Sequence, residues 1–297
     1  MKEKSVENKI PMLAVLVMGA AIISFSGVWV KWSHVPSTTS AFYRVFFGGI
    51  FLVAASIYRR EWCRPGRRQL LLMVLCSFFF SLDLWLYHYS INRIGPGLGT
   101  ILPNFQVFIL TAIGIVFLKE TIPIQFILSV PLAFAGLLMV VGVDWDNLNQ
   151  TYRLGILAGL AAAVCYSGFL LSLRRLQAEQ SGISFFYVLT LVSLISTVFL
   201  GSQVYVSSES FRIPGLMSLA SLIALGLFSQ FLGWIFIANT LPKIRASLSG
   251  LVLLLQPALA FVWDVLIFSR PMGWINWCGV GIVLMAIYLG TVRSVEN

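Results

Sequence analysis

Uninterrupted apolar runs about 20 residues long dominate this chain of 297 residues. A run of that length is what an α-helix needs to cross a hydrocarbon core about 30 Å thick. Inside a membrane every backbone polar group must be satisfied within the protein, which leaves helices or a closed barrel, and runs this long and this apolar are typical of helices. The sequence predicts ten such helices, at 11–32, 37–58, 69–90, 96–118, 123–142, 153–174, 182–205, 214–238, 244–268 and 271–292.

The composition supports an all-α polytopic membrane protein that forms a single membrane domain over 1–297. Hydrophobic residues make up 59% of the chain and charged residues only 10%, and no polar segment is long enough for a second, soluble domain. The net charge of +9 does not indicate nucleic-acid binding, because the basic residues stand between the apolar runs rather than in one stripe. The four cysteines lack paired spacing, so neither disulfides, a metal site nor a cofactor is predicted.

The basic residues predict the orientation of the chain. If the N-terminus is placed inside, most of the 20 Lys and Arg residues fall in loops on that same side. Such an asymmetry marks the cytoplasmic side of a membrane protein. We therefore expect a multi-pass protein of a bacterial-type inner membrane with both termini in the cytoplasm.

Two halves of the chain match weakly but in the same order. Phe25-Ser26-Gly27 parallels Tyr166-Ser167-Gly168, and at a constant offset Gln106 aligns with Gln256. The matches divide the chain into two five-helix repeats, 11–142 and 153–292. Because five is odd, the second repeat must enter the membrane from the opposite side. The predicted fold is therefore ten transmembrane helices as two inverted five-helix repeats, an architecture from which many secondary transporters are built.

Several motifs resemble one transporter family. The second helix begins Ser40-Ala41-Phe42-Tyr43-Arg44, and the stretch Ile94-Gly95-Pro96-Gly97-Leu98-Gly99-Thr100 leads to Pro103 in the fourth helix. Leu118-Lys119-Glu120 closes that helix, and Pro257 in the ninth helix is the approximate partner of Pro103. With ten helices arranged as five plus five, the chain resembles an EamA-type member of the drug/metabolite transporter superfamily over nearly its full length.

The resemblance implies a secondary carrier with a central cavity between the halves and without an ATPase. The family most often exports amino acids and related metabolites, and this is the function we expect. The expected partners are a small-molecule substrate and the lipid bilayer, with no nucleic acid. The sequence leaves open the substrate, the direction of transport, the coupling ion and the oligomeric state.

Ionisable side chains inside spans indicate function, because they are expensive to bury in a membrane. Arg44 and Asp83 lie on consecutive helices, each about 10 Å below the outer surface. An ion pair between them is therefore expected. It either neutralises two buried charges, or it lets Asp83 hold the Arg44 guanidinium in place for a substrate carboxylate.

Other polar and aromatic residues complete the predicted binding site. Trp85 and His88 share a helix face with Ser81 and belong either to the cavity or to an aromatic belt at the membrane interface. Gln106 and Gln256 lie near the midplane and either face the cavity or join helices. The full set of predicted substrate-binding residues is Arg44, Asp83, Trp85, His88, Thr100, Asn104, Gln106, Tyr166, Gln230, Trp234 and Gln256.

Competing functions receive less support from the sequence. An importer or exchanger of another metabolite (nucleotide-linked, sugar or quaternary amine) is the alternative among transporters. An intramembrane enzyme would need a nucleophile with a base, or a metal cluster. The chain has two histidines and no HExxH or GxSG motif, so an enzyme is not predicted. A non-transporting receptor would need neither an inverted repeat nor a polar midplane.

Overall fold

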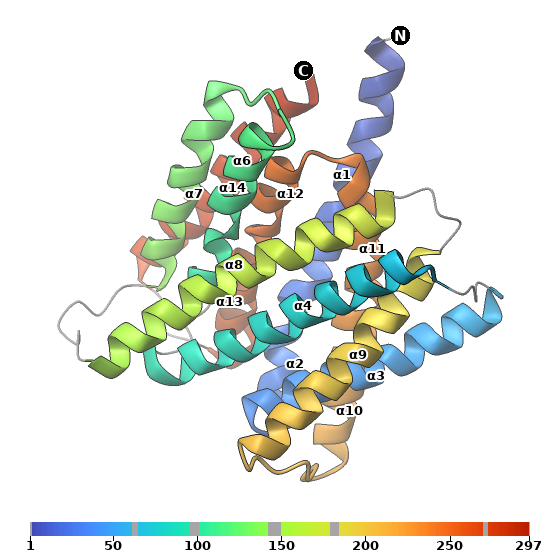
Figure 1. Cartoon of the computed structure of the whole chain (residues 1–297). Coiled ribbons are helices and arrows are strands. Elements are labelled where there is room, and N and C mark those ends of the chain that lie inside the picture. Colours follow the sequence, from blue (N-terminus) through green and yellow to red (C-terminus); the bar gives the residue numbers. More distant parts are fainter. Residues whose placement is uncertain are drawn as a thin grey trace.

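The computed structural model describes residues 2–60, 65–94, 101–141, 150–178, 184–269 and 273–296 (Figure 1). Seven of its helices are long and apolar enough to cross a membrane, and three shorter apolar helices lie at Leu102–Val116, Ile124–Met139 and Trp274–Gly290. Large apolar side chains also cover the outside of the bundle, for example Leu128 and Val198, which are 63% and 74% exposed. Such a surface suits lipid and confirms the predicted all-α polytopic membrane fold.

The helices follow the ten predicted spans in order. The first five spans are α1 (Lys2–Ser24) continued by α2 (Ser26–Ser33), α3 (Ser37–Tyr58), α4 (Arg67–Ile94), η1 (Leu102–Phe105) continued by α6 (Gln106–Val116), and α7 (Ile124–Val141). The last five are α8 (Gln150–Ala178), α9 (Phe185–Val206), α10 (Leu216–Ala224) continued by η2 (Leu225–Gly233), α11 (Trp234–Thr240) and η3 (Leu241–Lys243), then α12 (Ala246–Leu253) continued by α13 (Leu255–Phe268), and α14 (Trp274–Glu296). The two chain ends lie at the same end of the bundle, as an even number of crossings requires (Figure 1).

Equivalent helices of the two halves pack against each other. The second and seventh spans meet as α3 on α9, the fourth and ninth as α6 on α12, and the fifth and tenth as α7 on α14. The third span, α4, packs along the sixth, α8, and the eighth span packs on the first in the matching contact of α11 with α1. A two-fold axis between repeats produces this pattern, because each helix then meets its own counterpart or a symmetric partner.

Within the residues that the structure describes, four spans depart from regular α-helix in the middle of the bundle. In the fourth span Pro103 lies in the 3-10 turn η1, and in the ninth span Pro257 follows a break at Leu254, whose N–H donates to Leu251 O at 3.1 Å. Proline lacks a backbone N–H and cannot continue the hydrogen-bond ladder, so it favours such breaks. The first span breaks at Phe25, and the eighth contains the π-helical segment η2.

Glycines set the closest helix contacts. The spacing of Gly155 and Gly159 predicts close approach of the sixth span to a neighbour. In the structure a Cβ on Gly159 would lie 2.7 Å from Leu102 Cβ and 2.9 Å from Ser90 Oγ. Close packing at this pair is therefore confirmed.

Gly136 is the position at which we expect added volume to be least tolerated in the contact of α7 with α14. A Cβ on Gly136 would lie 2.8 Å from the carbonyl oxygen of Gly279 and 3.0 Å from the backbone nitrogen of Val283, and backbone atoms cannot rotate away. We expect Gly136→Ala to lower the free energy of unfolding by about 1–3 kcal/mol. Gly281→Ala on α14 is the matched control, because a Cβ there meets nothing within 4 Å. Thermal unfolding in detergent should separate the two variants, and equal stability would contradict this packing.

Candidate substrate cavity

A cavity of about 430 Å³ lies between the two halves. Its lining comes from spans one to six, eight and nine, and it begins at the ends of helices, at Lys31 near the end of α2 and Ser37 at the start of α3. From there it reaches Arg44, Tyr166 and Trp234 in the middle of the bundle. It therefore starts at the bundle end opposite the chain termini, which we call the open end, and we call the end that holds the termini the closed end.

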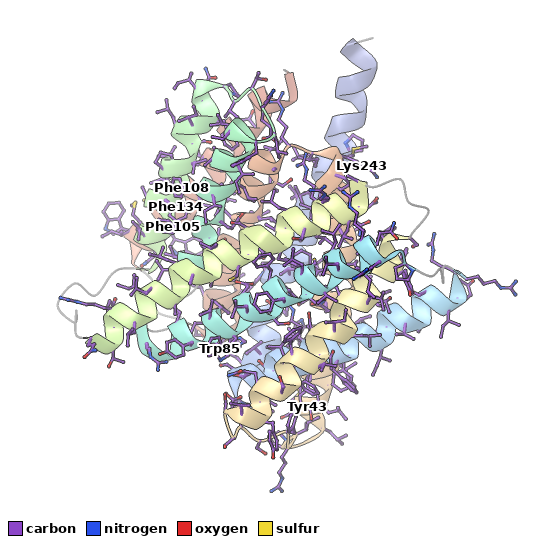
Figure 2. All side chains as sticks on the ribbon, viewed as in Figure 1. Tyr43, Trp85, Phe105, Phe108, Phe134 and Lys243 are labelled. Atoms are coloured by element: carbon purple, nitrogen blue, oxygen red, sulfur yellow. The ribbon has the colours of Figure 1, made fainter. Side chains whose placement is uncertain are left out.

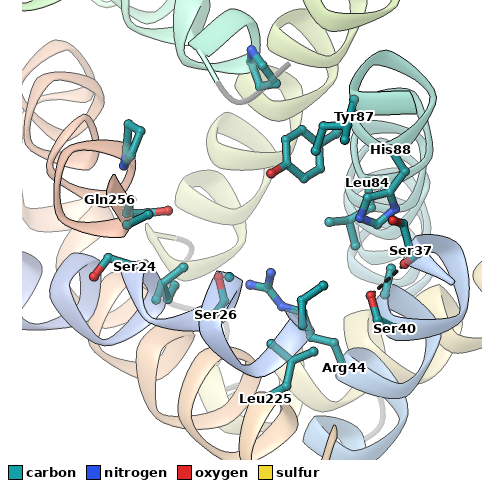
Figure 3. A pocket seen from close by; sticks show the side chains of 18 of the residues that line it. Ser24, Ser26, Ser37, Ser40, Arg44, Leu84, Tyr87, His88, Leu225 and Gln256 are labelled. Atoms are coloured by element: carbon teal, nitrogen blue, oxygen red, sulfur yellow. Dashed lines mark hydrogen bonds between the residues drawn. The ribbon is translucent and has the colours of Figure 1, made fainter. Parts of the chain in front are cut away.

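Arg44 extends from α3 into the cavity (Figure 3). Its Nε is buried and has no hydrogen-bond partner. The guanidinium interacts electrostatically with Asp83, Tyr87 and Tyr166, all of which line the same cavity. Arg44 is thus the cation at the centre of the candidate site.

Asp83 lies across from Arg44 on α4 and is 7% exposed. The two side chains act on each other through space. Within the described part of the chain no direct ion pair joins them, which differs from the contact expected from their equal depth. Both side chains line the cavity and face its space.

Three further lining residues have a buried side-chain nitrogen without a hydrogen-bond partner. They are His88 at Nδ1, Trp234 at Nε1 and Gln256 at Nε2, and the Gln256 amide lies close enough to the Tyr166 hydroxyl to interact with it. A buried polar atom that lacks a partner costs about 1–3 kcal/mol, so a solute that accepts hydrogen bonds in this cavity would gain from these groups. The cavity therefore holds several buried polar nitrogens near Arg44 that a bound solute could contact.

The rings of Phe80 and Trp234 line one wall of the cavity, and Phe169 packs behind them. Phe80 stacks on Phe169 with ring centroids 4.5 Å apart, and Trp234 meets these rings edge-on at 5.8 Å and 4.8 Å. Rings packed in this way have little freedom, so they offer a preformed apolar surface. The cavity can hold a solute with an apolar body and a small number of charged atoms.

The structure brings seven of the eleven predicted residues to the cavity. Those that line it are Arg44, Asp83, His88, Asn104, Tyr166, Trp234 and Gln256. Thr100 lies outside the described residues.

Three predicted residues lie elsewhere. Gln106 is fully buried and donates from Nε2 to Gly250 O at 3.2 Å, and Gln230 donates from Nε2 to Ser193 Oγ at 3.0 Å. Trp85, which Figure 2 labels on α4, packs on Tyr89 with ring centroids 5.9 Å apart and does not line the cavity. The two glutamines join helices, and the cavity face of α4 is rotated away from the one predicted through Trp85.

The residues missed by sequence reasoning include Tyr87, Ser26 and Ser40 (Figure 3). Tyr87 is one helical turn after Asp83, and positions i and i+4 share a helix face. That spacing could have found it. Ser26 lies beside the break at Phe25, and Ser40 donates to Ser37 O at 2.8 Å in the first turn of α3.

The closed end is joined by hydrogen bonds around Glu120, which follows α6. Its Oε1 accepts from Ala246 N at 2.8 Å and its Oε2 accepts from Ser247 Oγ at 2.6 Å. Arg174 on α8 donates to Ile244 O, and Arg245 donates to Thr121 O at 3.0 Å. These bonds join the loop after the fourth span to the start of the ninth span, between the cavity and the closed end.

Comparisons with known proteins agree with this architecture. An "Uncharacterized transporter" from Archaeoglobus fulgidus is 25% identical over 211 residues, which is 68% of this chain and 72% of the relative. A protein with a solved crystal structure aligns over 95% of this chain and 99% of its own with a TM-score of 0.80. Because the two sequences are only 14% identical, this likeness shows a shared fold and nothing about function.

The family match is divided in the same way as the helices. The model of the EamA-like transporter family matches the chain twice, over residues 10–142 and 153–292. The two matches cover most of the sequence and support the repeat seen in the packing. The protein is therefore a multi-pass membrane transporter, not an enzyme, and the chain belongs to the EamA-like transporter family.

Proposed function

We propose that this transporter exports an amino acid or a closely related zwitterionic metabolite. The observation that carries the proposal is the pair of opposite charges, Arg44 and Asp83, that line one cavity without a direct ion pair between the two described side chains. A guanidinium binds a carboxylate through paired hydrogen bonds, and a carboxylate suits an ammonium group. The aromatic wall then accommodates the remainder of the solute.

The charge of the lining favours a zwitterion over a phosphorylated metabolite. Arg44 is the cation in the middle of the described lining, and the other lysine or arginine along it, Lys31, lies near the open end. A diphosphate would place several negative charges beside Arg44 and Asp83. The carboxylate of Asp83 would repel them, whereas an ammonium group would bind it.

The direction of export rests on the orientation that we propose for the chain. Most Lys and Arg residues fall in loops on the side of the termini, which places the closed end in the cytoplasm and the open end outside the inner membrane. The structure would then represent the outward-facing form of the carrier. Reaction of a single cysteine added at either terminus with an impermeant thiol reagent in intact cells would contradict this orientation.

Counterflow in proteoliposomes tests the proposed substrate. Vesicles are loaded with one unlabelled amino acid, and the entry of the same labelled compound is followed. We expect accelerated entry for amino acids, and at least tenfold slower entry for the N-acetyl derivative, which lacks the ammonium group, and for the amide, which lacks the carboxylate.

The alternatives appear as other outcomes of the same panel. Equal exchange of the blocked derivatives would contradict recognition of a zwitterion. Exchange of sugars, nucleotides or quaternary amines in place of amino acids would overturn the proposed substrate class. Vesicles without protein control for leakage.

A further inference from the structure

Two glutamines occupy equivalent positions in the fourth and ninth spans but lie in different surroundings. Each is beside a proline-associated break, Gln106 after Pro103 and Gln256 before Pro257. Gln106 is fully buried outside the cavity. Gln256 lines the cavity, as Figure 3 shows, and its amide lies beside the Tyr166 hydroxyl, which lines the same cavity. The structure thus breaks the symmetry of the repeat at this pair.

Gln106 seals the seam between α6 and α12 on the side of the closed end. Its Nε2 donates to Gly250 O at 3.2 Å. Gly250 allows the helices to come this close, since a Cβ there would lie 3.1 Å from Leu110 Cδ1 and 3.3 Å from Val107 Cα. The contact therefore joins a side chain of one repeat to the backbone of the other.

The seal leaves part of the amide unsatisfied. Gln106 Oε1 is buried and has no hydrogen-bond partner. An unsatisfied buried acceptor costs about 1–3 kcal/mol, which matches or exceeds the roughly 0.5–1.5 kcal/mol that the bond to Gly250 contributes. Moving Gln106 from this position into a polar cavity therefore costs little free energy.

Inverted repeats supply the reason for such an exchange. Alternating access in such a carrier moves one repeat against the other around the site between them. Because a two-fold axis relates the repeats, the form open to the other side gives each repeat the surroundings that its partner has in this form. In this structure the glutamine of the second repeat lines the cavity and the glutamine of the first repeat seals the seam. After the exchange their surroundings are reversed.

We infer that Gln106 and Gln256 alternate between these two roles during transport. In the form shown here Gln256 contacts the solute and Gln106 closes the seam. In the form open at the closed end Gln106 enters the cavity and its amide binds the solute, while Gln256 withdraws. Gln106 is thus a substrate-contacting residue of the opposite form, an inference that rests on the proposed carrier function.

Side-specific thiol labelling tests the alternation. The native cysteines are replaced, one cysteine is introduced at position 106 or 256, and a membrane-impermeant thiol reagent is added to one face of oriented proteoliposomes. We expect Gln256→Cys to react from the face of the open end and Gln106→Cys from the face of the closed end. When an exchanging amino acid is added, we expect the rate at 106 to rise and the rate at 256 to fall, each at least threefold.

A matched control and a second reporter keep the test decisive. Gln230→Cys is the control, because Gln230 is 2% exposed and bonded to Ser193 outside the seam, and it should stay unlabelled from both faces. If Gln106→Cys does not fold, the labelling of Leu110→Cys reports on the same seam, one helical turn closer to the closed end.

Two results would overturn the alternation. One is labelling of 106 and 256 from the same face. The other is a protein that exchanges solute while both 106 and 110 stay unreactive. Reciprocal labelling without amino-acid exchange would instead reject the proposed substrate and leave the alternation standing.

Discussion

Arg44→Ala is expected to reduce amino-acid counterflow by about 30-fold to several thousand-fold. This range follows from the cost of about 2–5 kcal/mol for removing one partner of a buried, hydrogen-bonded charge pair. In the structure Arg44 lines the middle of the cavity with an unpaired Nε, so a solute carboxylate is the partner that the substitution would leave without its cation. Initial rates of counterflow in proteoliposomes with equal amounts of protein give the measurement.

Arg212→Ala is the matched control for loss of one positive charge. Arg212 lies in the exposed loop before α10, outside the cavity lining. We expect this variant to retain counterflow within about twofold. A comparable loss in both variants would mean that general charge at the open end matters, rather than a carboxylate contact at Arg44.

Combining Arg44→Ala with Asp83→Asn distinguishes a structural role of Arg44 from a substrate-binding role. If Arg44 only neutralises Asp83, then Arg44→Ala together with Asp83→Asn restores transport. If Arg44 binds the carboxylate, the double variant stays inactive while its thermal stability in detergent stays close to that of the unaltered protein. We expect the second result, since the described structure holds the two groups apart and both face the cavity.

The fold could be predicted almost completely from the sequence. Apolar length decides which segments cross a membrane, and an odd number of spans in each repeat decides that the halves are inverted. Pro103 and Pro257 mark two of the four spans that break beside the cavity, whereas no proline announces the breaks in the first and eighth spans. These features depend on local chemistry, which a single chain displays directly.

The site was less predictable because it depends on how each helix is rotated about its axis. Trp85 and Tyr87 are two residues apart, about 200° around α4, yet Tyr87 lines the cavity and Trp85 does not. Apolar spans carry little periodicity to settle this rotation, since a face in lipid and a face in the core are both hydrophobic. A polar anchor such as Asp83 is the best guide, and Phe80 and Tyr87, three residues before it and four after it, follow from it by helical spacing.

Sequence equivalence also cannot show which of two related residues faces the cavity in a given form. Gln106 and Gln256 were predicted as cavity residues together, and the structure places one in a seam and the other in the cavity. Two inverted repeats with similar sequence adopt different conformations in any form that is open at one end. The difference is a property of the whole bundle rather than of either segment.

Glu120→Ala is expected to be the most destabilising change among the polar residues at the closed end. The carboxylate accepts from Ala246 N and Ser247 Oγ, which belong to residues 3% and 2% exposed at the start of α12. The substitution leaves both donors buried and unpaired and removes a negative charge from a helix N-terminus. We expect the free energy of unfolding to fall by about 1.5–3 kcal/mol, which corresponds to a Tm lower by roughly 3–12 °C.

Glu209→Ala provides the control because it removes a similar contact from the other end of the bundle. Glu209 Oε2 accepts from Thr39 N at 3.1 Å and Thr39 Oγ1 at 3.2 Å at the start of α3, but the Thr39 hydroxyl also reaches Ser210 O at 3.2 Å. Since that hydroxyl keeps a partner, we expect less than half the loss in Tm. Faster labelling of Leu110→Cys from the closed end in Glu120→Ala, and not in Glu209→Ala, would show that Glu120 holds the seam of α6 and α12 closed. Equal Tm values and equal labelling rates in the two variants would mean that the seam is held by apolar packing alone.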